Sequence, residues 1–252
     1  MSFVLFVVKF LSRFTNPLPK LGLGFSRKRA GLHNRWFESV AERIGDRLCP
    51  LTVIGALRKV RSVIVGLDID GVVADFLAPF LLLLEKRLGN GPISEESITD
   101  FKFKDHPLIS EEVVHDCMQT VSYDPHFWQN LSSMISPSDW QNLENLSRRR
   151  QLVFVTHRYV RETYDIHGIT CDWLKSHGIS KPVVHFTNEL KAELVQNLGV
   201  HLFMDDRHEN CQDVAENTEA VVLMPRRPYN ESFSHPRVKK IRDFSELFAH
   251  LS

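Results

Sequence analysis

Short apolar runs alternate with amphipathic segments over most of the chain. Each run is rich in Val, Ile, Leu and Phe and ends at polar or turn residues; the runs span 62–68, 152–156, 183–187, 201–205 and 220–224. Continuous apolar runs are typical of buried parallel strands, and strands that alternate with helices indicate a mainly parallel sheet. The pattern therefore predicts an α/β fold in which these five runs are strands.

Helices are predicted between the strands from their periodicity and their terminal residues. The predicted helices span 75–88, about 171–177, 189–198 and 244–251. A glycine follows each of the first three, and Thr170 is the expected N-cap of the second. The apolar stretch 76–84 is much shorter than the ~20 residues of a membrane span. We therefore expect it to form a buried helix that covers the sheet.

Residues 89–151 contain no strand pattern. Ser110 precedes Glu111 and Glu112, as at a helix start, and Ser136-Pro137 has the same character. The segment is too long for an ordinary crossover. We expect a core domain over 61–252 that is interrupted by a small helical cap at about 77–150. Residues 1–60 would form an N-terminal extension with lead-in helices.

The composition is that of an ordinary globular protein. The chain has 252 residues, a formal net charge of +0 and four widely spaced cysteines. The neutral balance argues against a general nucleic-acid binder, and the cysteine spacing argues against a zinc ribbon or a disulfide framework. Residues 1–37 contain no small-residue cleavage site, which argues against a secretory signal peptide. Because they also lack acidic residues, they fit a mitochondrial transit peptide or a membrane-surface helix, and a poorly ordered extension is the further alternative. We expect a cytoplasmic protein, with mitochondria as the alternative.

Polar groups follow three of the predicted strands. The groups are Asp68 and Asp70 after the first strand, Thr156 after the second, and Asp205 and Asp206 after the fourth, with Lys191 at the start of the helix before it. The carboxyl ends of parallel strands share one edge of a sheet, where ligands bind. Oxygen ligands without a His or Cys cage suit Mg²⁺. The set fits phosphoryl transfer through an aspartyl-phosphate, although Asp-x-Asp-Gly alone is as compatible with an ordinary acidic turn.

This ordered set resembles the four motifs of the haloacid dehalogenase superfamily. It is similar, more narrowly, to the 5'(3')-deoxyribonucleotidase family and its bacterial relatives, through segments 124–128 (DPHFW), 203–207 (FMDDR) and 227–230 (RPYN) and through Trp173. The resemblance extends from about Val63 to the C-terminus. It implies a Rossmannoid parallel sheet with helices on both faces, a hydrolase domain and a helical cap after the first strand.

The resemblance also implies roles for individual residues. Asp68 would be the nucleophile and a Mg²⁺ ligand, and Asp70 the general acid/base with its backbone carbonyl on the metal. Thr156 would hydrogen-bond the phosphoryl group, and Lys191 would hold the phosphate and the nucleophile together. Lys175 and Lys181 are alternatives for the lysine with less suitable spacing.

The same resemblance implies that Asp205 and Asp206 complete the metal site, Asp205 more directly. Mammalian members carry Thr-Ser-Pro at the second motif, where this chain has Thr156-His157-Arg158, so the resemblance does not extend to the nucleotide preference. His157 and Arg158 are candidate substrate contacts, with a surface position as the alternative for the arginine.

Aromatic residues of the cap are candidates for holding a base. Phe127 and Trp128 are the expected contacts, with Phe101 and Phe103 behind them. The alternative is that these rings only form the core of the cap.

The expected function is Mg²⁺-dependent hydrolysis of a phosphomonoester, most specifically as a 5'-nucleotidase acting on nucleoside monophosphates. Another small phosphate ester, such as a sugar phosphate, is the alternative substrate. A non-catalytic phospho-acceptor module is disfavoured because its acidic pair would follow the first strand. We expect a small phosphorylated partner, no polymeric nucleic acid and no transmembrane span, and a homodimer stays open.

Overall fold

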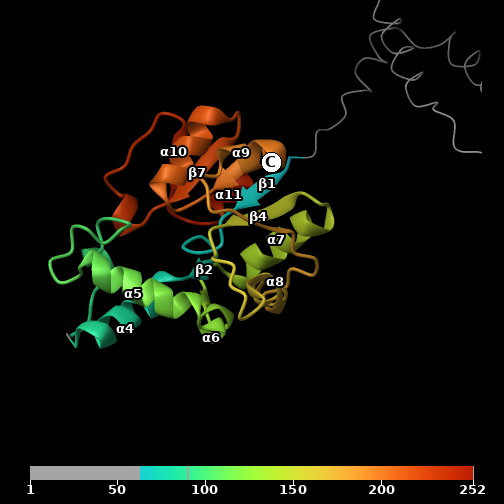
Figure 1. The fold of residues 1–252 in the computed structure, drawn as a ribbon. Helices are drawn as coiled ribbons and strands as arrows, with labels where there is room; N and C mark the ends of the chain where they lie inside the picture. Colours follow the sequence, from blue (N-terminus) through green and yellow to red (C-terminus); the bar gives the residue numbers. More distant parts are fainter. Residues whose placement is uncertain (1–62, 90, 252) are drawn as a thin grey trace, which may run out of the picture. The chain divides into compact units, whose positions relative to one another are not determined.

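The computed structural model describes residues 63–89 and 91–251 (Figure 1). The strands are β1 (Val65–Leu67), β2 (Ala74–Asp75), β3 (Ser132–Ser133), β4 (Leu152–Thr156), β5 (Val184–Phe186), β6 (Leu202–Met204), β7 (Val221–Pro225) and β8 (Val238–Ile241). The helices are α4 (Leu77–Leu88), α5 (Glu111–Ser122), α6 (Pro125–Gln129), α7 (Pro137–Arg148), α8 (Ile166–Ser176), α9 (Ala192–Asn197), α10 (His208–Asn217) and α11 (Glu246–Ala249), with short 3-10 helices η2 (Glu95–Ser97) and η3 (Pro228–Asn230). The predictions on residues 1–60 lie outside the described residues.

Within the described residues, six strands form one parallel sheet in the order β5-β4-β1-β6-β7-β8. The predicted α/β fold is confirmed, and all five predicted strands are present. β1 lies in the interior of the sheet, where Leu67 is paired with Phe154 of β4 and with Met204 of β6. This register brings Asp68 and Asp205, the next residues of β1 and β6, to the same edge of the sheet.

The sixth strand, β8, was not predicted. It lies at the edge of the sheet beside β7, and its sequence Val-Lys-Lys-Ile carries two lysines in the middle. Edge strands carry charged side chains that a buried strand does not tolerate. The apolar run that marks the other strands is therefore missing here.

Successive side chains of each strand point to opposite faces of the sheet, and each face has its own core. Leu202 and Met204 pack in the same core as Leu143 of α7, Leu174 of α8 and Leu247 of α11. The intervening Phe203 packs in a second core, with side chains of the other two helices: Val195 of α9, and Cys211, Val214 and Ala215 of α10. Helices thus cover both faces, as predicted.

Helices α4, α5 and α6, between β2 and β3, lie together in the lower part of Figure 1. These two strands form a short antiparallel ribbon in which Ala74 pairs with Ser133. The stretch 76–84 is helical from Leu77, as predicted, but the prediction that this helix covers the sheet is wrong, because α4 packs mainly against α5. Phe80 and Leu84 are buried there and explain the apolar run. The cap limits of about 77–150 stay a prediction; α7, inside that range, packs against β4.

The predicted start of α8 at Cys171 is wrong. The helix begins at Ile166, because the Asp165 side chain accepts a hydrogen bond from the Gly168 N–H and so acts as the N-cap. Thr170, the predicted cap, lies inside the helix and is buried.

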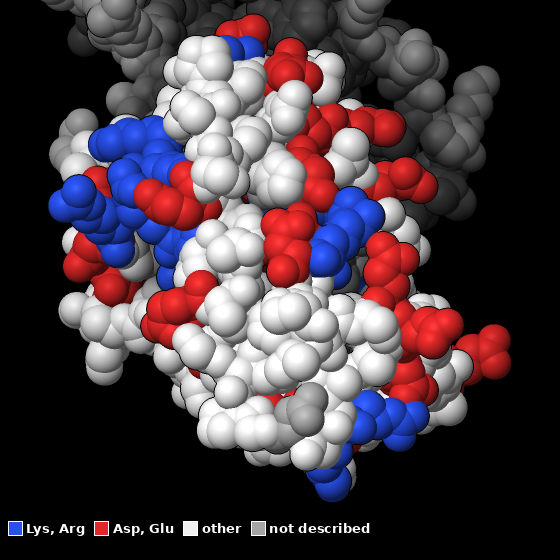
Figure 2. Space-filling view, turned by 90° about the vertical axis from the view of Figure 1, so that its left-hand side faces the viewer, with Lys and Arg blue, Asp and Glu red and all other residues white. Residues whose placement is uncertain are grey.

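Charged side chains of both signs occur among uncharged ones on the face shown in Figure 2. This mixture agrees with the net charge of +0. Within residues 63–89 and 91–251, no helix is long and apolar enough to cross a membrane.

Candidate active site

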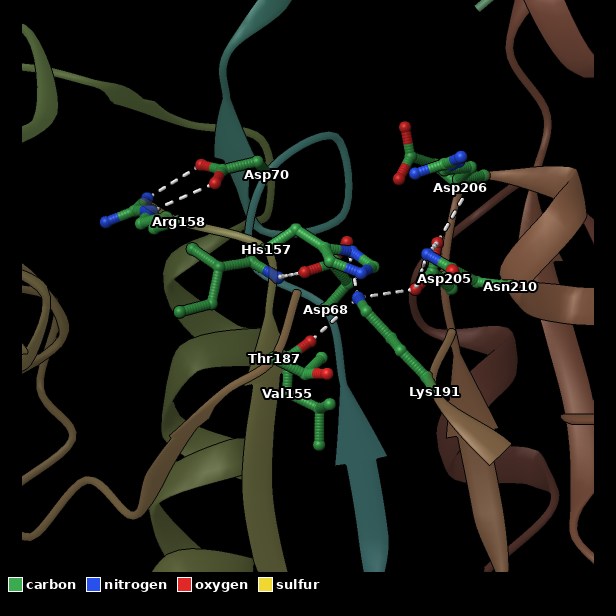
Figure 3. A network of polar contacts seen from close by, with 12 residues as sticks. Asp68, Asp70, Val155, His157, Arg158, Thr187, Lys191, Asp205, Asp206 and Asn210 are labelled. Atoms are coloured by element: carbon green, nitrogen blue, oxygen red, sulfur yellow. Dashed lines mark hydrogen bonds and ion pairs between the residues drawn. The ribbon is translucent and has the colours of Figure 1, made fainter. Parts of the chain in front are cut away.

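Asp68 lies directly after β1, at the carboxyl edge of the sheet (Figure 3). Its side chain is almost fully buried, and one carboxylate oxygen lies 2.9 Å from the Lys191 Nζ. The other accepts a hydrogen bond of 2.7 Å from the Ile69 N–H. The carboxylate is therefore held in one orientation, as a nucleophile must be.

Lys191 is fully buried at the N-terminal end of α9. Its Nζ donates to Asp205 Oδ2 at 2.7 Å and to the Val155 carbonyl at 2.8 Å, in addition to the ion pair with Asp68. Burial alone would lower the pKa of this ammonium, but the carboxylates of Asp205 and Asp68 outweigh it and raise the pKa to about 12. The lysine is therefore a permanent cation in the site. The alternatives Lys175 and Lys181 are exposed.

Three carboxylates converge beside this lysine. Oxygens of Asp68, Asp205 and Asp206 lie within 4.8 Å of one another. Burial, followed by the charge of Asp205, raises the pKa of Asp206 to about 7. Burial also raises the pKa of Asp68 well above its ordinary value, although Lys191 opposes the shift. One ammonium thus does not balance three buried acids, so the donor set fits a divalent cation bound through oxygen.

The two acids after β6 differ in the number of hydrogen bonds that their carboxylates accept. Asp205 accepts hydrogen bonds from Lys191, from the Asn210 side-chain amide at 3.1 Å and from the Arg207 N–H at 2.9 Å. The carboxylate of Asp206 accepts one from the Tyr229 hydroxyl and lines the adjoining cavity. This geometry favours Asp206 as the direct metal ligand, the opposite of the expected order.

Gly71 of the Asp-x-Asp-Gly turn is required by this arrangement. Its φ is +78°, in the region that glycine tolerates best, and a Cβ placed on it would lie 2.2 Å from the Asp206 Oδ2. A side chain at this position would therefore displace Asp206 from the acid cluster.

Thr156 ends β4 with a fully buried side chain that lines the same cavity. Its hydroxyl has no hydrogen-bond partner within the described part of the chain. An unpaired buried hydroxyl costs about 1–3 kcal/mol, so it marks a position where a ligand supplies the partner. A phosphoryl oxygen is the partner that the sequence predicts.

Asp70 stands apart from the acid cluster. Figure 3 shows its carboxylate turned toward Arg158, on the opposite side of Asp68 from Asp205 and Asp206. The arginine fork holds both oxygens, at 2.9 Å from Nε and 2.7 Å from Nη2. Arg158 was expected to contact the substrate or to lie at the surface, but it is buried behind Asp70 with its donors engaged.

A cavity of about 520 Å³ opens above these groups and is walled by the cap. Phe76, Phe80, Phe101, Phe103 and Trp128 contribute to its lining. Trp128 is thus placed as expected, whereas Phe127 lies behind it and packs edge-on against its ring at 5.3 Å. Phe101 and Phe103, expected behind, line the cavity.

His157 also lines the cavity. One ring nitrogen lies 2.8 Å from the Glu189 carbonyl, which fixes the imidazole. Burial and the nearby Lys191 lower the pKa of the ring, so it is neutral at pH 7.

Two residues of the site were not predicted from the sequence. Asn210, in the first turn of α10, lines the cavity, and its buried Oδ1 has no partner among the described residues. A carbonyl oxygen free in this position suits a metal-bound water. Tyr229, the donor to Asp206, belongs to the RPYN segment that carries the family resemblance, but the sequence alone assigned it no role.

The acid cluster predicts how stability depends on pH without metal. The pKa of Asp206 rises from 3.8 in the unfolded chain to about 7 in the fold, so the folded state binds more protons between these values. Asp206 therefore makes its full contribution to the free energy of unfolding below about pH 4, and this contribution is lost as the pH rises through 7. Thermal unfolding in EDTA and in Mg²⁺ should therefore differ more at pH 8 than at pH 5. If the unfolding temperatures in EDTA and in Mg²⁺ differed by the same amount at both pH values, the metal site would be contradicted.

Residues 61–251 match the family model described as "5' nucleotidase, deoxy (Pyrimidine), cytosolic type C protein". The chain is 26% identical over 172 residues to "Putative nucleotidase YqfW" of Bacillus subtilis, covering 66% of this chain and 81% of that protein. It is 25% identical over 187 residues to "Putative nucleotidase BH1399" of Halalkalibacterium halodurans, covering 73% of this chain and 90% of that protein.

Solved structures similar to the chain include a HAD-superfamily hydrolase of subfamily IA from Geobacter sulfurreducens. The TM-score is 0.46 at 15% identity, with 75% of this chain and 98% of that chain covered. The family predicted from the sequence is confirmed by the match over residues 61–251. The chain belongs to the 5'-nucleotidase, deoxy, cytosolic type C family and is a phosphatase of the nucleotidase type.

Proposed function

We propose that this protein is a Mg²⁺-dependent 5'-nucleotidase that hydrolyses nucleoside monophosphates through a phosphate ester on Asp68. The observation that carries the proposal is the unpaired, buried hydroxyl of Thr156. It lines the cavity that Asp68 also lines, at the carboxyl edge of the sheet. A phosphoryl group there would meet the nucleophile and a hydroxyl donor together, with the ammonium of Lys191 beside the nucleophile.

Asp68 and Asp206 would hold the metal by their side chains, with the Asp70 carbonyl as a further ligand. Bound Mg²⁺ would neutralise charge on the phosphoryl oxygens. Lys191, whose Nζ contacts Asp68, Asp205 and the Val155 carbonyl, would keep Asp68 ionised and oriented.

The reaction has two steps. Asp70 enters the reaction in its protonated form. Asp68 Oδ attacks phosphorus, the bond from phosphorus to the leaving oxygen breaks, and Asp70 gives that oxygen its proton. A water then attacks the same phosphorus, its proton passes to Asp70, and the bond to Asp68 breaks to release phosphate. Asp68 and Asp70 return to their starting states, so atoms and protons balance.

A nucleoside is the leaving group that the cavity favours. Partly exposed aromatic rings such as Phe76 and Phe101 give the cap wall flat apolar surfaces, on which a base can stack. A sugar phosphate would leave those surfaces without a partner. A cytoplasmic location and a homodimer stay predictions from the sequence.

Phosphate release from nucleoside 5'-monophosphates, glucose 6-phosphate and p-nitrophenyl phosphate tests the proposal. We expect nucleotides to be turned over with the highest kcat/KM in Mg²⁺, and EDTA to reduce turnover by at least about 100-fold because the acid cluster then lacks its cation. Faster hydrolysis of the sugar phosphate would contradict the substrate class. Full activity in EDTA would contradict the metal.

A further inference from the structure

The guanidinium of Arg158 has three partners. Nε and Nη2 bind the two oxygens of Asp70, and Nη1 donates to the Thr170 Oγ1 at 3.0 Å. The Cζ lies 4.9 Å from the centre of the Trp128 ring, within the range of a cation–π contact. The arginine thus joins the catalytic loop, α8 and the cap.

The pair is buried unevenly. The side chain of Arg158 is 0% exposed, whereas that of Asp70 is 20% exposed and lines the cavity. Burying a guanidinium is costly unless it is paired, and Asp70 is the carboxylate that pairs with it. Arg158 therefore holds both carboxylate oxygens from the buried side, and Asp70 is the member of the pair that is partly exposed at the cavity.

Thr170 fixes the arginine in turn. Its hydroxyl donates to the Ile166 carbonyl at 2.7 Å inside α8, which leaves its lone pairs for Arg158 Nη1. Thr170, which was expected to cap the helix, thus contacts the arginine from inside the helix.

Trp128 contacts one face of the guanidinium. Its indole Nε1 donates to the Val121 carbonyl at 3.1 Å, and its ring stacks on Phe76 with 5.8 Å between centroids. The same ring lines the cavity where the leaving group would lie. Arg158 thus connects the Asp70 carboxylate to Trp128 of the cap.

We propose that Arg158 is a positioning residue that, supported by Thr170 and Trp128, holds the Asp70 carboxyl at the leaving oxygen. This inference rests on the proposed function. It assigns Arg158 no contact with the phosphoryl group. Its loss should therefore slow the steps that need Asp70 and leave phosphate binding intact.

The test compares Arg158→Lys, which keeps the charge and removes the fork, with Thr170→Val, which removes the support. Arg161→Lys is the matched control: Arg161 lies in the same loop, donates to the Ser122 hydroxyl and stacks over Tyr123 at 4.8 Å. Each variant is assayed in Mg²⁺ with a nucleoside 5'-monophosphate and with p-nitrophenyl phosphate. The inhibition constant of inorganic phosphate is measured alongside.

For Arg158→Lys we expect kcat on the nucleotide to fall by about 10- to 100-fold, because a misplaced acid loses most of its effect. KM and the phosphate inhibition constant should stay within about threefold, since no phosphate ligand is lost. Thr170→Val should lower kcat less, in the same pattern, and Arg161→Lys should match the wild type.

The aryl ester adds a second signature. p-Nitrophenolate leaves without a proton, so its first release should survive as a burst in Arg158→Lys. The later turnover, which needs Asp70 to take a proton from water, should be slow.

An unchanged kcat, or weaker phosphate inhibition with kcat retained, would overturn the inference. If Arg158→Lys fails to fold, Thr170→Val decides by the same criteria, because it leaves every charge in place. A wild-type protein that hydrolyses neither ester would instead refute the proposed function itself.

Discussion

Replacement of Asp68 by Asn should abolish phosphatase turnover while the protein stays folded. Asn cannot form the ester with phosphorus, and removal of a nucleophile from a catalytic group costs about 10⁴-fold or more in kcat. The burial that raises the pKa of Asp68 also means that its charge strains the metal-free fold. We therefore expect Asp68→Asn to unfold in EDTA at the wild-type temperature or above it, which is measured by circular dichroism.

Asp172→Asn is the matched control for this change. Asp172 lies on the exposed side of α8 and pairs there with Lys175 at 2.8 Å. Its loss should leave turnover at the wild-type level. Near-normal phosphate release by Asp68→Asn would refute the covalent mechanism, because the proposed phosphate ester forms on Asp68.

Replacement of Lys191 by Met should destabilise the protein strongly. The ammonium is 0% exposed and pairs with Asp68 and Asp205, so its removal leaves buried carboxylates without their cation. Breaking a buried ion pair from one side costs about 3–5 kcal/mol in the free energy of unfolding. The deficit should be larger at pH 8 than at pH 5, because acids without their cation gain by binding protons. Urea unfolding at the two pH values measures both effects.

Lys175→Met provides the comparison for Lys191→Met. Lys175 is exposed and pairs with Asp172, a kind of contact worth at most about 1 kcal/mol. If both variants lost the same free energy of unfolding, Lys191 would not neutralise the acid cluster. Added Mg²⁺ should restore part of the loss in Lys191→Met only.

The strands and the strand-end groups were predictable because they depend on local sequence. An apolar run that ends in Asp68 or Thr156 identifies both the strand and the polar group after it. The parallel register then requires these groups to share an edge. β8 was missed because an edge strand with two lysines lacks that pattern.

The side chains that depend on distant partners were not predictable. Arg158 follows Thr156 closely in the chain, but its partner Asp70 lies 88 residues away. The order of Phe127 and Trp128 in the cap wall likewise depends on how α6 packs against other helices. The periodicity of a sequence predicts which face of its helix or strand a residue lies on. It does not predict which side chains of a neighbouring helix or strand that face will contact.

The interior position of β1 has a consequence for synthesis of the chain. β1 is made first among the strands of the main sheet, and its partners β4 and β6 start at residues 152 and 202. Both edges of an apolar strand therefore stay unpaired while more than half of the chain is still to emerge from the ribosome. Unpaired apolar strands promote aggregation, and pairings between distant residues form slowly. The nascent protein should thus depend on chaperones until β6 has been completed.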